Sequence, residues 1–564
     1  MYPNKTIKNQ NQNIQWSIFT ASYLHHLGVR HACISPGARN SPLTFAVTEH
    51  SNIKCTSHVD ERSSAFFALG LAKSTQKPVI LISTSGTAPA NFYPAVIEAS
   101  LSRVPLIILS ADRPAYLFST GANQTINQQN LYGNHVRYFT DVGLPKNNNE
   151  SLKKHLFTAF QHSFGLKFEE PPGPVHLNYP FDEPLLPENV SGINPHSFNF
   201  ENIEKPNVKF PIPILTEAKT PLIIVGPMEG NCHQKEMIQL AERIQAPILA
   251  DPLSQLRYGS NSKMVLANYD YFLRCKKINP DLIIRFGRKP TSKVLNQLLD
   301  KWKGKTILID AWRQFNDDCP QFIQSTIGGY CQYQIENCGW EGDLSWQNQL
   351  LAWEKQVSDI ILQESVFSEG TISKCCLESI KNDGQLFIGN SMPIRDVDLF
   401  TLASLKKIDT YSNRGASGID GVISSALGMS HNLVNKNSLL LIGDVSFYHD
   451  MNGLLASRYG ANLTIVIINN SGGGIFSFLP IAESGLENFQ QYWTTNTELQ
   501  INKVAELYSC KYYFAENLKE LDNSIQESFK NKGVQIIEVK TDTDENILAH
   551  NGLLEKVEIV LSGN

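Results

Sequence analysis

The chain repeats one local pattern, in which a short run of apolar, often β-branched residues is followed by a polar turn and then by a helical stretch. In the first third the runs are HACI at 31–34, PVILIS at 78–83 and PLIILS at 105–110, and ERSSAFFALGLAKS at 61–74 has helical spacing. Strands that alternate with helices form parallel sheets covered on their faces by helices. The pattern therefore predicts an α/β protein with doubly wound parallel sheets.

The chain is too long for a single core, because its 564 residues exceed the usual size of one domain several times. The strand-turn-helix pattern falls into three blocks, which we predict to be domains at residues 1–190, 205–345 and 355–564. A proline-rich stretch at 180–212 is typical of a domain edge and linker. The outer blocks place polar, glycine-bearing turns directly after their strands, so we expect the chemistry there.

Composition excludes several classes of function. A net charge of −5 with 18% charged residues gives no basic surface for nucleic acid. No run approaches the ~20 apolar residues that cross a bilayer, so we expect a cytoplasmic protein without a membrane anchor. The ten cysteines show neither the paired spacing of a zinc site nor a disulfide framework.

A candidate metal site lies between Gly443 and Gly474. Asp444 follows the apolar run SLLLIG, and Asn470 ends the next run, TIVIINN, before a glycine cluster. If the two runs are neighbouring parallel strands, both side chains lie at the same sheet edge, where α/β proteins bind ligands. An oxygen-rich site there suits Mg²⁺ bridging phosphates. The alternative is that Asp and Asn only make turns.

Arginines recur in turns after the predicted strands. A guanidinium at such a place can bind a carboxylate bidentately, and four of them together suggest substrates with more than one carboxylate, although each alone is often structural. They are Arg39, Arg113, Arg395 and Arg414. Glu61 begins the helical stretch at 61–74, and by itself it is most simply a helix-capping acid.

The spacing GD-x(24)-NN at 443–470 resembles the signature of thiamine diphosphate enzymes. Within them, SPGARNSPLT, HVDERSSAFFALG, TSGTAPANFYPAV, GNSMPIRD, SNRGASGIDG and GGGIFSFLP resemble the 2-succinyl-5-enolpyruvyl-6-hydroxy-3-cyclohexene-1-carboxylate synthase family of menaquinone biosynthesis. The resemblance implies a thiamine diphosphate-binding fold with pyrimidine-binding, central and diphosphate-binding domains. It also implies a transferase that decarboxylates 2-oxoglutarate, adds the succinic semialdehyde carbanion to isochorismate and releases CO₂.

Carried over residue by residue, the resemblance changes the interpretation of Glu61, which matches the glutamate that hydrogen-bonds the aminopyrimidine N1′ of the cofactor. The implied ligands of Mg²⁺, or of Mn²⁺ in its place, are Asp444, Asn470 and the carbonyl of Gly472. Ile419 matches the bulky residue that holds the cofactor bent. Further implied cofactor contacts are Gly389, Ser391 and Gly443.

The resemblance further assigns Gln124, Ser391 and Arg395, with Glu61, to catalysis. Implied substrate contacts are Arg39, Arg113, Asn123, Gln124, Arg395, Arg414, Ile475, Phe476 and Leu479. Departures from the family pattern are Val445, where many thiamine enzymes have glycine, Ala38 in place of a serine, and Lys293-Val294 where some members have a Lys-Arg pair. Because the family glutamate and metal site come from different subunits, a homodimer is implied, or a homotetramer built from two dimers.

Two other functions compete. One is a related 2-oxoacid decarboxylase or carboligase of the acetohydroxyacid synthase type, which would not need four arginines at strand ends. The other is an inactive, regulatory cofactor-binding protein, against which the presence of Glu61, Asp444 and Asn470 argues.

Overall fold

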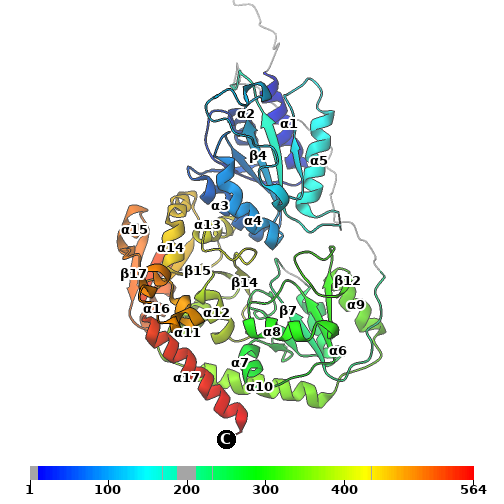
Figure 1. The fold of residues 1–564 in the computed structure, drawn as a ribbon, viewed down its shortest axis with the longest axis vertical. Helices are drawn as coiled ribbons and strands as arrows, with labels where there is room; N and C mark the ends of the chain where they lie inside the picture. Colours follow the sequence, from blue (N-terminus) through cyan, green and yellow to red (C-terminus); the bar gives the residue numbers. More distant parts are fainter. Residues whose placement is uncertain are drawn as a thin grey trace, which may run out of the picture.

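Three sheets of six parallel strands follow one another along the chain in the computed structural model (Figure 1). The structure describes residues 11–167, 169–186, 198, 211–230, 233–433 and 435–563. The predicted α/β class with doubly wound parallel sheets is confirmed. Most of the linker expected at 180–212 lies outside the described residues, and the predicted domain limits remain predictions.

The first sheet is covered on both faces because alternate residues of its strands point to opposite sides. On β3, Val79 and Leu81 join the core beneath α3 and α4, whereas Ile80 and Ile82 join the core beneath α1, α2 and α5. The strand order is β2 (Lys54–Ser57), β1 (His31–Ile34), β3 (Val79–Ser83), β4 (Leu106–Asp112), β6 (Pro174–Pro180) and β5 (Phe139–Asp141). The helices are α1 (Gln12–His26), α2 (Ser41–Thr48), α3 (Glu61–Thr75), α4 (Tyr93–Ser102) and α5 (Glu150–Phe164).

The second sheet has the same plan. Its strand order is β12 (Gln321–Gln324), β11 (Thr306–Asp310), β10 (Leu282–Phe286), β7 (Pro221–Val225), β8 (Ile248–Ala250) and β9 (Val265–Leu266). Its helices are α6 (Gln234–Arg243), α7 (Tyr269–Cys275), α8 (Lys293–Lys301) and α9 (Ile327–Asn337). The long helix α10 (Leu344–Gln363) then leads to the third sheet and packs against the C-terminal helix (Figure 1).

The third sheet carries the predicted metal site. Its strand order is β14 (Ile408–Tyr411), β13 (Gly384–Ile388), β15 (Ser438–Gly443), β16 (Leu463–Asn469), β18 (Val534–Lys540) and β17 (Lys511–Ala515). Its helices are α11 (Glu369–Ser379), α12 (Met392–Phe400), α13 (Val422–Asn432), α14 (Asp444–Asp450), α15 (Ile501–Leu507), α16 (Leu518–Ser528) and α17 (Thr543–Ser562).

The connection between β15 and β16 is not a single α-helix. It begins as α14 and continues as a 3₁₀ segment, η5 (Met451–Tyr459). Gly453 packs so closely on the first turn of α13 that a Cβ there would lie 2.3 Å from Ser424 Oγ. The other short helices are η1 (Pro89–Phe92), η2 (Ala115–Leu117), η3 (Gly133–His135), η4 (Lys303–Lys305), η6 (Gly474–Phe478), η7 (Pro480–Ser484) and the π-helical η8 (Gln490–Thr494).

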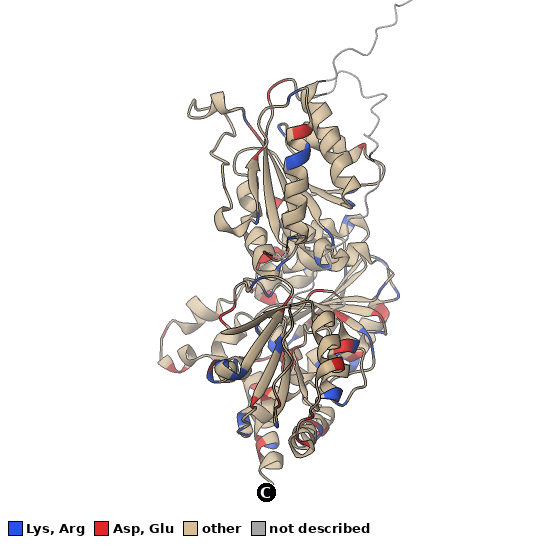
Figure 2. Cartoon of the chain, turned by 90° about the vertical axis from the view of Figure 1, so that its right-hand side faces the viewer, with Lys and Arg blue, Asp and Glu red and all other residues tan. Residues whose placement is uncertain are grey.

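A buried lysine joins the three sheets. Lys73 of α3 donates to the Ser412 carbonyl at 2.7 Å and to Glu229 at 3.3 Å, and it lies 4.0 Å from Glu98. Glu98 in turn accepts hydrogen bonds from the backbone of the loop after β14. Acidic and basic residues elsewhere are interspersed over all three domains (Figure 2).

Candidate active site

Asp444 and Asn470 follow two strands that pair directly. β15 and β16 are parallel neighbours, with Gly443 opposite Ile468, so the two polar side chains leave the same sheet edge. Asp444 is 3% exposed. Burial raises the pKa of its carboxyl to about 6, against the opposing effect of backbone N–H groups that include those of Val445 and Gly472. A cation at this carboxylate would offset the cost of its burial.

The Asn470 amide is fixed in one orientation. Its Nδ2 donates to Glu369 Oε1 at 2.8 Å, while its Oδ1 is buried and has no hydrogen-bond partner. A buried acceptor without a partner is costly, so it calls for an unseen ligand. An amide oxygen beside a buried carboxylate is a suitable donor pair for a hard cation such as Mg²⁺.

The loop after Asn470 brings backbone groups close together. Gly472 has a φ of +140°, and a Cβ there would lie 2.4 Å from the Thr494 carbonyl oxygen, so only glycine fits. Among the described residues there is no cluster of three or more His, Cys, Asp or Glu side chains able to hold a metal. The oxygens of one carboxylate and one amide, those of Asp444 and Asn470, are of the kind that a hard cation shared with a diphosphate takes.

A polar cavity of about 530 Å³ opens beside Asp444, over the carboxyl ends of β16, β18 and β17, and Asn470 is not among the residues that line it. Asp444, Asn469 and Ser471 line it from one side, and Glu538 and Lys540 line it from another. The carboxyl edge of the third sheet is therefore hollowed, as expected for a ligand-binding edge.

Asn390 ties together the loops after β13 and β14. This buried side chain donates from Nδ2 to the carbonyls of Asn413 at 2.8 Å and Gly418 at 2.7 Å, and its Oδ1 accepts from Arg414 at 3.1 Å. All of its strong hydrogen-bonding atoms are thus engaged. Sequence reasoning placed Asn390 in the turn but did not rank it as a site residue.

Ser391 and Arg395 meet at the start of α12. Ser391 has a φ of +72°, a strained conformation of the kind that concentrates at functional sites, and its carbonyl accepts from the Arg395 guanidinium. Partial desolvation and then the nearby charge of Arg414 lower the pKa of Arg395. The guanidinium groups of Arg395 and Arg414 therefore contact two consecutive residues, Ser391 and Asn390, at this edge. Gly389, just before them, donates its N–H to the Leu441 carbonyl at 2.8 Å and so fixes the turn against β15.

The predicted apolar residues border the same edge. Ile419 is 37% exposed, and its carbonyl accepts from Ser446 Oγ at 2.8 Å, which links its loop to α14. Ile475 and Phe476 are half-buried on η6, and Leu479 follows them with 39% exposure. These side chains leave apolar surface available beside the polar groups.

The remaining predicted substrate residues lie on the first sheet. Arg39 is buried and donates a hydrogen bond to the Phe181 carbonyl at 3.0 Å. It also forms an ion pair with Glu183 at 3.3 Å. Arg113 is half-buried after β4, and Asn123 and Gln124 lie in an exposed loop. In the described part of the chain, no hydrogen bond or ion pair connects these residues with those at the third sheet.

Glu61 is the first residue of α3, but it does not cap the helix. Asp60 is the cap, because its side chain accepts from the backbone N–H groups of Arg62 and Ser63. Arg62 donates to the His449 carbonyl at 2.8 Å, so this helix end contacts the far end of α14 from Asp444. Within the described residues, no hydrogen bond or ion pair joins Glu61 to the Asp444–Asn470 pair.

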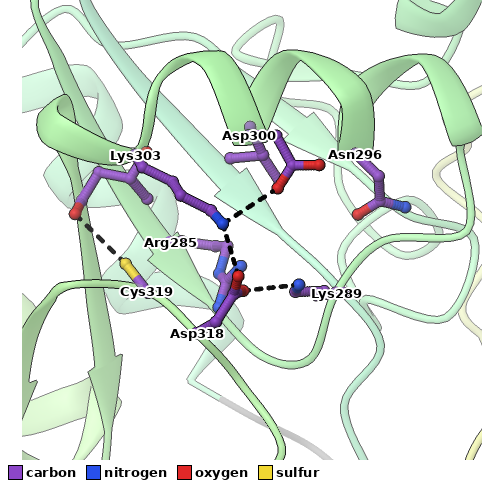
Figure 3. Close-up of a pocket in the computed structure, with 9 residues that line it drawn as sticks. Arg285, Lys289, Asn296, Asp300, Lys303, Asp318 and Cys319 are labelled. Atoms are coloured by element: carbon purple, nitrogen blue, oxygen red, sulfur yellow. Dashed lines mark hydrogen bonds and ion pairs between the residues drawn. The ribbon is translucent and has the colours of Figure 1, made fainter.

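The central domain contributes less. Lys293 is exposed at the start of α8, where Ser292 caps the helix. A small cavity of about 70 Å³ lies nearby, and its charges are paired among themselves: Asp318 lies 2.7 Å from Lys289 and 2.6 Å from Lys303 (Figure 3). The active site is therefore not assigned to this cavity.

Sequence reasoning found no sign of Glu369, the partner of Asn470, because no local motif marks it.

In the described part of the chain, every helix is too short or too polar to cross a membrane.

Comparison with known proteins agrees with this geometry. Residues 17–131 match the family model described as the N-terminal TPP binding domain of thiamine pyrophosphate enzymes, residues 215–388 match a middle domain, and residues 399–539 match the C-terminal TPP binding domain. Three parallel sheets with an oxygen-rich site on the third are what this class requires. The chain is a thiamine diphosphate enzyme.

Similar proteins of known name show which family of thiamine diphosphate enzymes the chain belongs to. Proteins called 2-succinyl-5-enolpyruvyl-6-hydroxy-3-cyclohexene-1-carboxylate synthase are similar over nearly the whole chain. That of Listeria innocua is 40% identical, covering 96% of this chain and 98% of the relative. The Geobacillus kaustophilus protein is 38% identical with the same coverage, and the Bacillus pumilus protein is 37% identical over 94% of this chain and 95% of its own. The chain belongs to this synthase family, and it is a carbon–carbon bond-forming enzyme of menaquinone biosynthesis.

Proposed function

We propose that the enzyme binds thiamine diphosphate together with Mg²⁺, or Mn²⁺, through Asp444, Asn470 and the Gly472 carbonyl. The observation that carries this proposal is the buried Asn470 Oδ1, which has no hydrogen-bond partner within the described part of the chain. Asp444 supplies the charge, and its carboxylate is buried, so a cation bound there would compensate a charge removed from water. Ser391 and the glycines at 389 and 443 border the space for the diphosphate.

The substrates we propose are 2-oxoglutarate and isochorismate, joined with loss of CO₂ to give the product after which the relatives are named. When bound, the cofactor supplies an electron sink for the charge that decarboxylation leaves. Glu61 would hold the proton at the aminopyrimidine N1′ and thereby promote removal of the C2 proton. Ile419 would contact the cofactor and hold it in its bent shape.

Charge matching supports acidic substrates. Arg395 and Arg414 lie close together at the third sheet, and each guanidinium can bind a carboxylate bidentately. Ser391 and Gln124 would orient the reacting groups, while Ile475, Phe476 and Leu479 would exclude water. Arg39, Arg113 and Asn123 would complete the pocket from the first sheet, with Lys293 as a weaker candidate.

We also infer a homodimer, in which Glu61 of one subunit serves the metal site of its partner, and two dimers could pair as a tetramer. Its support is that no hydrogen bond or ion pair joins Glu61 to Asp444 in the described part of the chain, and that the end of α3 next to Glu61 contacts the opposite end of α14. Apolar side chains near Glu61 are exposed in the single chain, including Val59 at 68% and Tyr448 at 50%. A second copy would cover them.

One assay tests the reaction. Purified enzyme freed of ligands should convert 2-oxoglutarate and isochorismate to 2-succinyl-5-enolpyruvyl-6-hydroxy-3-cyclohexene-1-carboxylate only when thiamine diphosphate and Mg²⁺ are both added. Pyruvate in place of 2-oxoglutarate is the control, because a monocarboxylate leaves one arginine contact unused. Equal turnover with pyruvate would favour an acetohydroxyacid synthase type of activity, and a cofactor-bound but inert protein would favour a regulatory role.

A further inference from the structure

Glu369 is a buried carboxylate that the mechanism above does not use. It is the first residue of α11 and only 1% exposed. The helix does not need it as a cap, because Ser368 and Thr371 form a reciprocal capping box. A carboxylate removed from water costs stability unless polar groups compensate it, so the placement needs a reason.

The contacts of Glu369 supply that reason. Its Oε1 accepts from Asn470 Nδ2 at 2.8 Å and from Thr541 Oγ1 at 3.2 Å, and its backbone N–H donates to Asn546 Oδ1 at 3.2 Å. The carboxylate of α11 therefore accepts hydrogen bonds from the loop after β16 and from the loop after β18, while the backbone N–H of the same residue donates to α17. The side chain of Thr541 and the backbone contact to Asn546 fix the place of Glu369 independently of Asn470.

The neighbouring asparagine shows what is special about Asn470. Asn469 also donates to a carboxylate, with Nδ2 at 2.7 Å from Glu538 Oε1, but its Oδ1 accepts from the Ser471 backbone N–H at 3.2 Å. Asn469 is thus satisfied at both ends within the chain. Asn470 is satisfied only at its nitrogen, and its oxygen is left for a ligand.

We propose that Glu369 is a positioning residue that keeps the Asn470 amide oxygen, and not its NH₂ group, directed at the Mg²⁺ of the cofactor. The inference rests on the proposed function, since it takes Asn470 as a metal ligand. The two ends of an amide are nearly equal in size, but only the oxygen can coordinate a cation. A carboxylate that accepts from the NH₂ end selects the productive orientation, as outer-shell partners do at other metal sites.

The test measures metal binding directly. Mn²⁺ is titrated into ligand-free enzyme at saturating thiamine diphosphate, and free Mn²⁺ is followed by electron paramagnetic resonance. Glu369→Leu keeps the volume of the side chain and removes the acceptor, and it should weaken Mn²⁺ binding about 10- to 100-fold. Glu369→Gln can still accept through its amide oxygen and should stay within about threefold of wild type.

A matched control and a double variant complete the design. Glu354 is a half-buried glutamate that accepts from the backbone N–H groups of Ala267 and Asn268, so Glu354→Gln makes the same substitution as Glu369→Gln away from the site. Its Mn²⁺ affinity should not change. In an Asn470→Ala background, Glu369→Leu should weaken binding no further, because the group it positions is gone.

The outcomes separate the two proposals. If Asn470→Ala binds Mn²⁺ as wild type does, the metal site itself is wrong. If Asn470→Ala weakens binding but Glu369→Leu does not, Glu369 has no positioning role and this inference fails. Should Glu369→Leu not fold, Glu369→Ala is measured in its place, and a wild-type affinity in that variant would overturn the inference equally.

Discussion

At the scale of single residues, hydrogen bonds that engage one end of a polar side chain decide what its other end can do. Asp60 takes the capping role at α3, so the Glu61 carboxylate is not needed by the helix. Glu369 takes the NH₂ end of Asn470, so the oxygen is available. Asn390, by contrast, is hydrogen-bonded at both its nitrogen and its oxygen, to Asn413, Gly418 and Arg414, so its side chain connects two loops.

We predict that Glu61→Gln binds the cofactor normally but loses turnover. An amide cannot share a proton with N1′ as a carboxylate does, and loss of such a group typically lowers the rate by about 10² or more. The measurements are kcat and thiamine diphosphate affinity by fluorescence. Glu150→Gln, a change in the exposed first-turn acid of α5, is the control. Wild-type turnover in Glu61→Gln would remove the proton role.

Arg395→Ala should discriminate between oxoacids. Losing a charge-assisted hydrogen bond to the distal carboxylate should lower kcat/KM for 2-oxoglutarate roughly 10- to 100-fold, with a smaller effect on pyruvate. Arg313→Ala, at an exposed position of the central domain, is the control and should change neither value. An equal loss with both oxoacids would exclude Arg395 from carboxylate recognition.

The buried His176 should make the stability of the first domain sensitive to acid. Burial lowers the pKa of His176 to about 3, below the value of 6.5 expected when unfolded, so the unfolded chain takes up a proton that the folded chain refuses. Its contribution to stability is complete above pH 6.5 and falls as the pH drops, by about 1.4 kcal/mol per pH unit.

Buried acids such as Asp112, whose pKa is raised to about 7, make the protein more stable as the pH falls and so mask the effect of His176 on the total stability. The difference between wild type and His176→Gln removes their contribution, because both proteins contain the same acids. The free energy of urea unfolding is measured for both proteins at pH 7.5, 6 and 5. The difference between wild type and variant should shift against wild type as the pH falls. A difference that stays constant with pH would contradict the assignment.

Much of the site could be predicted from residue types at strand ends. Asp444 and Asn470 each follow a strongly apolar run, so their place at one sheet edge follows from local pattern and parallel pairing. Glu369 could not be found in this way. It lies 101 positions from Asn470, and as an acid in the first turn of a helix it looks like an ordinary dipole contact.

At the scale of elements, strands were more predictable than their connections. A buried parallel strand is a nearly continuous apolar run, which the sequence displays directly. The switch from α14 to the 3₁₀ segment η5 depends on how closely Gly453 packs on Ser424, a tertiary contact without a local signal. The same holds for the crossing of α3 and α13, which brings the first and third domains together.

Glycines set the closeness of that crossing, and we predict that Gly70→Ala weakens it. A Cβ at Gly70 would lie 1.9 Å from the Ser425 carbonyl oxygen, and one at Gly428 would lie 2.0 Å from that of Phe67. The contacting atoms belong to the backbones of α3 and α13, which cannot shift without disturbing helix packing, so Gly70→Ala should cost about 1–3 kcal/mol of stability. Gly552 of α17 has free space around it, so Gly552→Ala should instead leave stability unchanged or raise it. Thermal midpoints that move alike in both variants would contradict the crossing argument.

At the scale of the whole molecule, the positions of Glu61 and Asp444, for which we propose roles in proton transfer and metal binding, bear on how many chains build one site. Glu61 stands at the end of α3 that contacts His449 through Arg62, whereas Asp444 begins α14 at the other end. If a partner subunit supplies Glu61 to each metal site, two chains with different defects can restore one complete site between them. Symmetry makes both sites of a dimer equivalent, so each mixed dimer contains one intact site and one with both defects.

We therefore predict complementation between Glu61→Gln and Asp444→Ala. Each variant alone should be nearly inactive, the second through loss of metal and cofactor binding. After the two are unfolded together in equal amounts and refolded, half of the dimers should be mixed, giving about a quarter of wild-type activity. Refolding each variant alone is the control, and sedimentation analysis establishes the dimer. Activity that stays at the level of the single variants in a verified mixed dimer would show that Glu61 and Asp444 serve the same site within one chain.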